Sequence, residues 1–100
     1  MAQFDYYARS GGAGFWVDCQ TELMEAYQTR FVVPLVPSED APRPSAAQLN
    51  PRFEIAGRNY ELLTQFAGTI PLDELGRPIG SLEDQRYALL KALDFLITGV

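Results

Sequence analysis

The sequence of 100 residues contains no histidine, one cysteine and one lysine. Without histidine there is no Ser/His or Cys/His nucleophilic pair, and no catalytic metal held by histidine. Cys19 alone cannot form an intrachain disulfide, and no set of cysteines and histidines exists to hold structural zinc. We therefore expect no metal, no organic cofactor and no enzyme of these classes. The scarcity of cysteine also favours a cytoplasmic location.

Basic segments and long apolar runs are also missing. The segment Met1 to Asp5 has no basic region, and no stretch reaches the roughly 20 apolar residues of a membrane span. We expect neither a cleaved export signal nor a membrane partner. The chain has 13 acidic and 8 basic residues, a formal net charge of −5. Such a chain is not expected to bind the phosphate backbone of nucleic acids by itself.

The composition that remains is that of one globular domain over residues 1–100, with 47% hydrophobic residues. Gln3 to Ala8 is short and rich in aromatics, and a flexible loop, Ser10 to Gly14, separates it from Phe15 to Gln20. This pattern predicts a β-hairpin. Within it, strand alternation places the Asp18 carboxylate on the face opposite Val17 and Cys19.

The middle of the chain predicts more strands. Residues 21–29 are a polar connection with an apolar tip at Leu23 and Met24, and residues 30–37 form the strongest strand. Pro34 and Pro37 remove backbone donors, so the far end of this strand is expected at an edge or a bend. Further on we expect an exposed loop over residues 38–45, a hairpin of residues 52–56 and 60–64 turning at 57–59, a short strand over 68–71 and a loop over 72–80.

The end of the chain predicts one helix from Leu82 to about Ile97. Ser81 would cap its first turn, with Asp84 three residues later as a variant capping box. The apolar positions fall on one helical face: Leu82, Leu89, Leu93 and Leu96, with Leu90 and Ile97 alongside. The apolar end either covers the core or forms a surface for a second copy or a partner.

Chemically suggestive residues are few. Asp73, Glu74 and Arg77 lie together in a loop and could in principle cleave a phosphodiester by acid/base chemistry, although exposed loop charges are common. Cys19, inside a predicted strand and without a basic partner, is expected to be a small buried hydrophobe. The glycines of the first hairpin loop lack the helix and lysine of a phosphate-binding loop.

Seven landmarks in order along the chain resemble those of the CcdB toxins of bacterial toxin-antitoxin modules. They are Gln3-Phe4, Val17-Asp18-Cys19-Gln20, Val33-Pro34-Leu35, Leu49-Asn50-Pro51, Ile55-Ala56-Gly57, Ile70-Pro71 and Gly99-Val100. The resemblance covers nearly the whole chain. It implies a mainly β fold with one C-terminal helix, an SH3-like barrel of the CcdB/MazF type, that forms a homodimer.

The resemblance also implies a function. CcdB toxins are not enzymes: they bind the A subunit of DNA gyrase and trap the cleaved DNA complex. A CcdA-like antitoxin neutralises them and represses the shared operon together with the toxin, so operator DNA is contacted only through that complex. Modules of this kind maintain plasmids. The alternatives are an endoribonuclease of the MazF/Kid type, which has the same fold, and an antitoxin-binding homologue that does not poison.

By position, the resemblance assigns gyrase binding to two segments of the chain, and the acidic charge suggests where a basic antitoxin segment would bind. The gyrase-binding residues are Leu23, Met24, Asp94, Ile97, Thr98, Gly99 and Val100. The antitoxin-binding residues are Glu22, Glu25 and Asp94. At two positions the chain departs from the family: Thr98 stands where the gyrase poisons have Trp, and Asp94 stands where an amide is expected.

Overall fold

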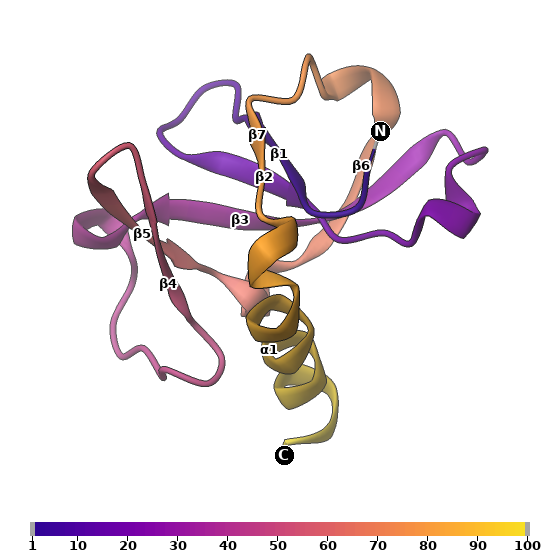
Figure 1. The fold of residues 1–100 in the computed structure, drawn as a ribbon. Coiled ribbons are helices and arrows are strands. Elements are labelled where there is room, and N and C mark those ends of the chain that lie inside the picture. The colour runs from indigo at the N-terminus through magenta and orange to yellow at the C-terminus, as the bar shows by residue number, and fades with distance from the viewer. Residues whose placement is uncertain (1, 100) are drawn as a thin grey trace.

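The computed structural model describes residues 2–99 and forms a strongly bent sheet packed against one helix (Figure 1). The strands are β1 (Asp5–Ala8), β2 (Phe15–Asp18), β3 (Thr29–Pro37), β4 (Arg52–Ile55), β5 (Arg58–Leu62), β6 (Gly68–Pro71) and β7 (Gly80–Ser81). The helix α1 spans Arg86–Thr98, and short 3-10 turns lie at Glu22–Met24, Ser38–Asp40, Thr64–Phe66, Leu72–Glu74 and Glu83–Gln85. The expected mainly β fold with one C-terminal helix is confirmed, and the sheet forms a half-barrel.

Strand β3 organises the sheet. The order of strands in the sheet is β4-β5-β3-β2-β1-β7, and β6 also pairs with β3. All these pairings are antiparallel, with Val33 opposite Val17 on β2 and Arg30 opposite Ile70 on β6. Beyond Leu35, β3 pairs with β5 and no longer with β2, which agrees with the bend or edge expected at Pro37. The β-branched residues of β3 favour this central, extended conformation.

The core lies between the concave side of the sheet and α1, which crosses below it in Figure 1. Helix residues Leu89 and Ala92 are fully buried. The sheet contributes apolar residues from several strands: Tyr6, Val17, Val33, Leu35, Phe53, Tyr60 and Leu62. Burial of each large apolar side chain contributes about 1.5–3 kcal/mol, so this one cluster is the main source of stability.

Two details of the predicted hairpins were wrong. The second hairpin turns at Ala56 and Gly57, both with positive φ, and Arg58 already pairs with Ile55. Two left-handed residues give a turn whose twist matches that of the strands, so a third turn residue is not needed. The first hairpin also ends earlier than expected: its second strand, β2, stops at Asp18 and does not reach Gln20.

The helix likewise starts later than expected. Ser81 belongs to β7, and its hydroxyl accepts a hydrogen bond of 3.1 Å from the Glu83 N–H, capping a 3-10 turn that precedes α1. Leu82 is buried before the helix begins. The expected apolar face is also only partly buried: Leu96 is 42% exposed, whereas Ala92 takes a core position.

Gly14 provides a test of the first hairpin. Its φ is 95°, and a Cβ at this position would collide with the backbone of Leu35 and Val36 on β3. Gly11 has a similar φ of 79° but open space around it. We expect Gly11→Ala to lower the free energy of unfolding by about 1–2 kcal/mol, the cost of the left-handed conformation. Gly14→Ala should lower the free energy of unfolding by at least about 2 kcal/mol more than Gly11→Ala, because its Cβ collides with the backbone of β3.

Urea unfolding of the two variants at one protein concentration measures this difference. Equal losses of stability in both variants would contradict the close approach of the first hairpin loop to β3.

Candidate functional site

The first group of candidate residues lies at the end of α1. Ile97 is 79% exposed, and Asp94, Thr98 and Gly99 are exposed as well. The Thr98 hydroxyl donates a hydrogen bond of 2.7 Å to the Asp94 carbonyl oxygen. Gly99 ends the helix with φ 78°, and its N–H donates to the Phe95 carbonyl oxygen at 2.9 Å. The structure therefore brings these four residues together, while Val100 lies outside the described residues.

The second group lies in the exposed segment 21–28, which we call the tip loop. Leu23 is 88% exposed and Met24 42% exposed, in a 3-10 turn that begins where the Thr21 hydroxyl accepts the Leu23 N–H at 3.4 Å. Glu22 and Glu25 are also exposed here. Tyr27, which the sequence interpretation did not select, is 61% exposed in the same loop. The tip loop thus presents apolar side chains to solvent within an acidic segment.

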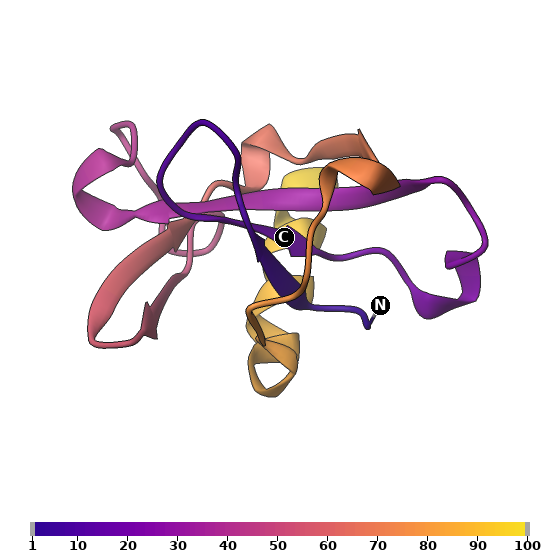
Figure 2. The same ribbon diagram turned by 90° about the horizontal axis from the view of Figure 1, so that it is seen from above.

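Within one chain these two groups are separate. Figures 1 and 2 show the tip loop beyond the start of β3, whereas α1 runs away from the sheet and ends at the bottom of the molecule in Figure 1. Leu23 and Met24 therefore do not share a continuous surface with Ile97 and Thr98 in one copy of the chain. The three acidic candidates are divided in the same way, with Asp94 on the helix and the two glutamates on the tip loop.

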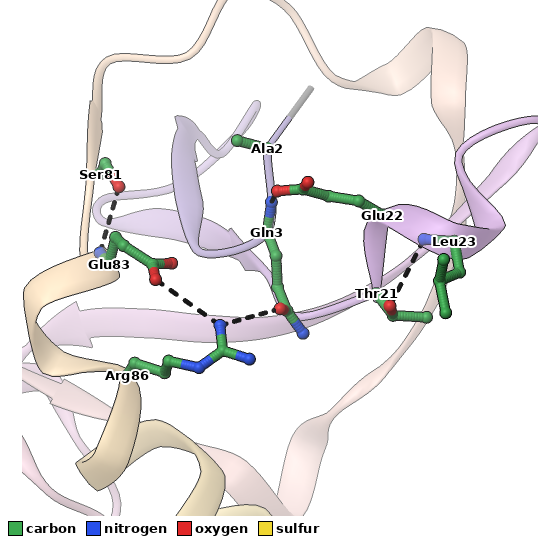
Figure 3. Close-up of a pocket in the computed structure, with 8 residues that line it drawn as sticks. All are labelled: Ala2, Gln3, Thr21, Glu22, Leu23, Ser81, Glu83 and Arg86. Atoms are coloured by element: carbon green, nitrogen blue, oxygen red, sulfur yellow. Dashed lines mark hydrogen bonds and ion pairs between the residues drawn. The ribbon is translucent and has the colours of Figure 1, made fainter.

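A hollow of about 500 Å³ lies beside the tip loop (Figure 3). Its lining residues come from the N-terminal segment, the tip loop, β7, the 3-10 turn after it and the first residue of α1: Ala2, Gln3, Thr21, Glu22, Leu23, Ser81, Glu83 and Arg86. Gln3 stands between the two sides: its N–H donates to the Glu22 carboxylate at 3.3 Å, and its side-chain oxygen accepts from Arg86 at 3.2 Å. Arg86 also pairs with Glu83 at 3.6 Å.

Sequence reasoning missed Glu83 and Arg86. They are ordinary exposed charges at the start of a helix, and only folding brings them next to the N-terminus. Gln3 was selected as a family landmark but not as a site residue. The hollow has a carboxylate on each side and one guanidinium, so its charge is mixed rather than complementary to a single ion.

The residues considered for other chemistry do not form a site of that kind. Asp73, Glu74 and Arg77 are all exposed, so nothing desolvates a potential acid or base among them. Cys19 is 7% exposed, and burial raises the pKa of its thiol to about 12, which makes it a buried hydrophobe as expected. Within residues 2–99, no three His, Cys, Asp or Glu side chains are grouped to hold a metal.

A family model for the CcdB protein matches residues 3–99. The chain belongs to the CcdB family. Membership makes it a toxin of the CcdB type, a family of gyrase-poisoning proteins that are not themselves enzymes and have antitoxin partners in general. The half-barrel with one C-terminal helix agrees with this family. Among residues 2–99 there is no helix of the length and apolar character needed to span a membrane.

Proposed function

We propose that this CcdB-family chain is the toxin of a type II toxin-antitoxin module that binds the A subunit of DNA gyrase and traps its cleaved complex with DNA. One observation carries the proposal: two projecting parts of the molecule expose apolar side chains to solvent. Leu23 is 88% exposed on the tip loop and Ile97 79% exposed on α1. Burying one such side chain against a partner contributes about 1.5–3 kcal/mol.

Trapping of the cleaved complex follows from preferential binding. A protein that binds one state of its target more tightly than the others increases the population of that state. If the toxin binds the open, DNA-cleaved state of gyrase, resealing of the DNA is disfavoured by the difference in binding free energy. The toxin needs no catalytic group for this mechanism, and its proposed docking residues are apolar or small: Leu23, Met24, Ile97, Thr98, Gly99 and Val100, with Asp94 beside them.

The proposed active form is a homodimer. Leu90, Leu96 and Ile97 leave apolar surface of α1 uncovered in one chain, and a domain of 100 residues buries only a modest core. A twofold dimer would cover part of this helix surface. It would also bring two helix ends, and so two copies of the Asp94 to Gly99 group, into one assembly.

Light scattering at micromolar concentration tests the dimer. We expect a mass twice that of the 11.2 kDa chain. A mass near that of the single chain would overturn this part of the proposal.

Thr98 determines the expected strength of gyrase binding. The gyrase poisons that the chain resembles have Trp at this position, and the small Thr98 side chain offers little flat apolar area for stacking. Its hydroxyl is moreover already bonded to the Asp94 carbonyl. We expect weak binding to the gyrase A subunit of a standard laboratory host. Thr98→Trp should strengthen this binding at least about tenfold, or about 1.4 kcal/mol.

A binding assay on purified toxin and gyrase A measures this change. Lys91→Trp is the matched control, because it places the same ring two turns earlier on α1 at an exposed position. This control should leave the affinity within about twofold. Equal gains from both variants would show nonspecific adhesion of the ring. Absence of binding by the natural protein and by Thr98→Trp would refute gyrase as the target.

The proposed antitoxin is CcdA-like, with a basic disordered segment that meets Glu22, Glu25 and Asp94. The net charge of −5 and the exposure of these three carboxylates support this assignment. The complex of toxin and antitoxin would repress the operon, with operator DNA contacted through the antitoxin. In this proposal the toxin acts in the cytoplasm, and the toxin-antitoxin module has a role in plasmid maintenance.

Charge complementarity predicts that the affinity for the antitoxin segment falls as the salt concentration rises. Replacing each of the three carboxylates by its amide should weaken binding at low salt about two- to fivefold. Glu54→Gln, an exposed change on β4, serves as the control and should have no effect. An affinity that does not depend on salt, or equal effects in all four variants, would contradict the electrostatic part of the proposal. Titration calorimetry at several salt concentrations provides the measurement.

A further inference from the structure

The tip loop is unusual because it is exposed along its whole length and yet firmly bonded. All eight of its residues are exposed, and three of them are large and apolar: Leu23, Met24 and Tyr27. An exposed loop of this length ordinarily bonds to water and varies in shape. Here its carbonyl groups accept hydrogen bonds from two side chains that belong to the sheet and its border.

Arg30, the second residue of β3, forms most of these bonds. Its side chain is only 5% exposed. One terminal nitrogen donates to the carbonyl oxygens of Tyr27 and Thr29, each at 2.9 Å, and the other donates to Glu25 at 3.0 Å. The planar guanidinium group thus fixes two backbone positions in the second half of the tip loop, Glu25 and Tyr27, together with the first residue of β3, Thr29. The Asp18 carboxylate, 3.6 Å from Arg30 Nε, balances the buried charge.

Gln20 holds the first half of the tip loop. Its side-chain oxygen accepts the Phe31 N–H of β3 at 2.9 Å, and its side-chain nitrogen donates to the Met24 carbonyl oxygen at 3.0 Å. One amide therefore links the central strand to the turn that bears the apolar tip. The Gln28 carbonyl, at the other end of the tip loop, accepts the Leu72 N–H at 2.8 Å.

We propose that Gln20 and Arg30 are positioning residues, which hold the tip loop in one shape and so present Leu23, Met24 and Tyr27 to the gyrase A subunit. The inference rests on the proposed function and extends it to residues that do not touch the target. Ordering a backbone residue on binding costs free energy, so a loop fixed beforehand binds more tightly. Stability of the sheet alone would not require apolar side chains at the tip.

Gln20 is the position at which to test this, because truncation of Arg30 would leave Asp18 buried without its partner. Gln20→Glu keeps the oxygen that accepts the Phe31 N–H and removes the donor to Met24. Gln28→Glu makes the same chemical change at an exposed side chain of the same loop, and is the matched control. Both variants add one negative charge, Gln20→Glu directly before the tip loop and Gln28→Glu at its last residue.

The first readout is hydrogen exchange of the full-length protein without a partner. Gln20→Glu should speed the exchange of the Met24 to Tyr27 amides about tenfold, while Val33 and Leu35 in the core keep their rates. Gln28→Glu should change neither. Unchanged exchange in the tip loop of Gln20→Glu, or equal acceleration in the core, would overturn the inference whether or not the toxin binds gyrase.

The second readout is a double-mutant cycle for binding to the gyrase A subunit. Gln20→Glu should weaken binding about tenfold in the natural sequence, but less than about threefold once Leu23→Ala has removed the most exposed of the three apolar side chains that the loop presents. Equal effects in both backgrounds would overturn the positioning role. If the natural protein does not bind gyrase, the proposed function fails, whereas accelerated exchange would still assign loop fixation to Gln20.

Discussion

A buried guanidinium group connects the sheet of this protein to the exposed tip loop. Arg30 lies at the start of β3, pairs with Asp18 at the end of β2, and donates to the carbonyl groups of the tip loop. Burial raises the pKa of Asp18, although the Gln20 N–H and Arg30 both act to lower it. Removing one partner of such a buried pair lowers the free energy of unfolding by about 3–5 kcal/mol, because the other charge is left buried without a partner. Neither residue can therefore be replaced without consequences for the tip loop.

This arrangement separates two tasks along the chain. The concave sheet and the buried side of α1, with Leu89 and Ala92, make a core that stabilises the fold. The tip loop and the end of α1 instead leave Leu23 and Ile97 in solvent. Exposed apolar side chains on well-fixed backbone are suited to docking, since their burial is favourable and little order remains to be imposed. In a homodimer, such a chain would offer each surface twice. A binding toxin, which needs shape rather than catalytic chemistry, fits this description.

The sequence pattern predicts strands, helix and their order, because alternation and helical spacing report which side chains face a core. This prediction fails where the conformation or burial of a residue differs from what is usual for its residue type. Ala56 adopts positive φ in the second hairpin turn, and an alanine gives no signal for that conformation. Leu82 and Leu96 are alike in sequence, yet the first packs before the helix and the second faces solvent. The role of Arg30 could not be predicted either, because the carbonyl groups that it binds converge on it only in the folded chain. The candidate residues at the end of α1 come from their family positions and stay a prediction, whereas nothing in the sequence pointed to Arg86 or Tyr27.

We propose that the target protein docks on both projecting surfaces of this CcdB-family toxin, the tip loop and the end of α1. Hydrogen-exchange footprinting of the toxin, alone and with a saturating excess of gyrase A subunit, measures it directly. We expect slower exchange in residues 21–28 and in residues 95–99, since both surfaces become buried in the complex. Protection confined to other segments, such as the hairpin of β4 and β5, would rule out docking on these two surfaces.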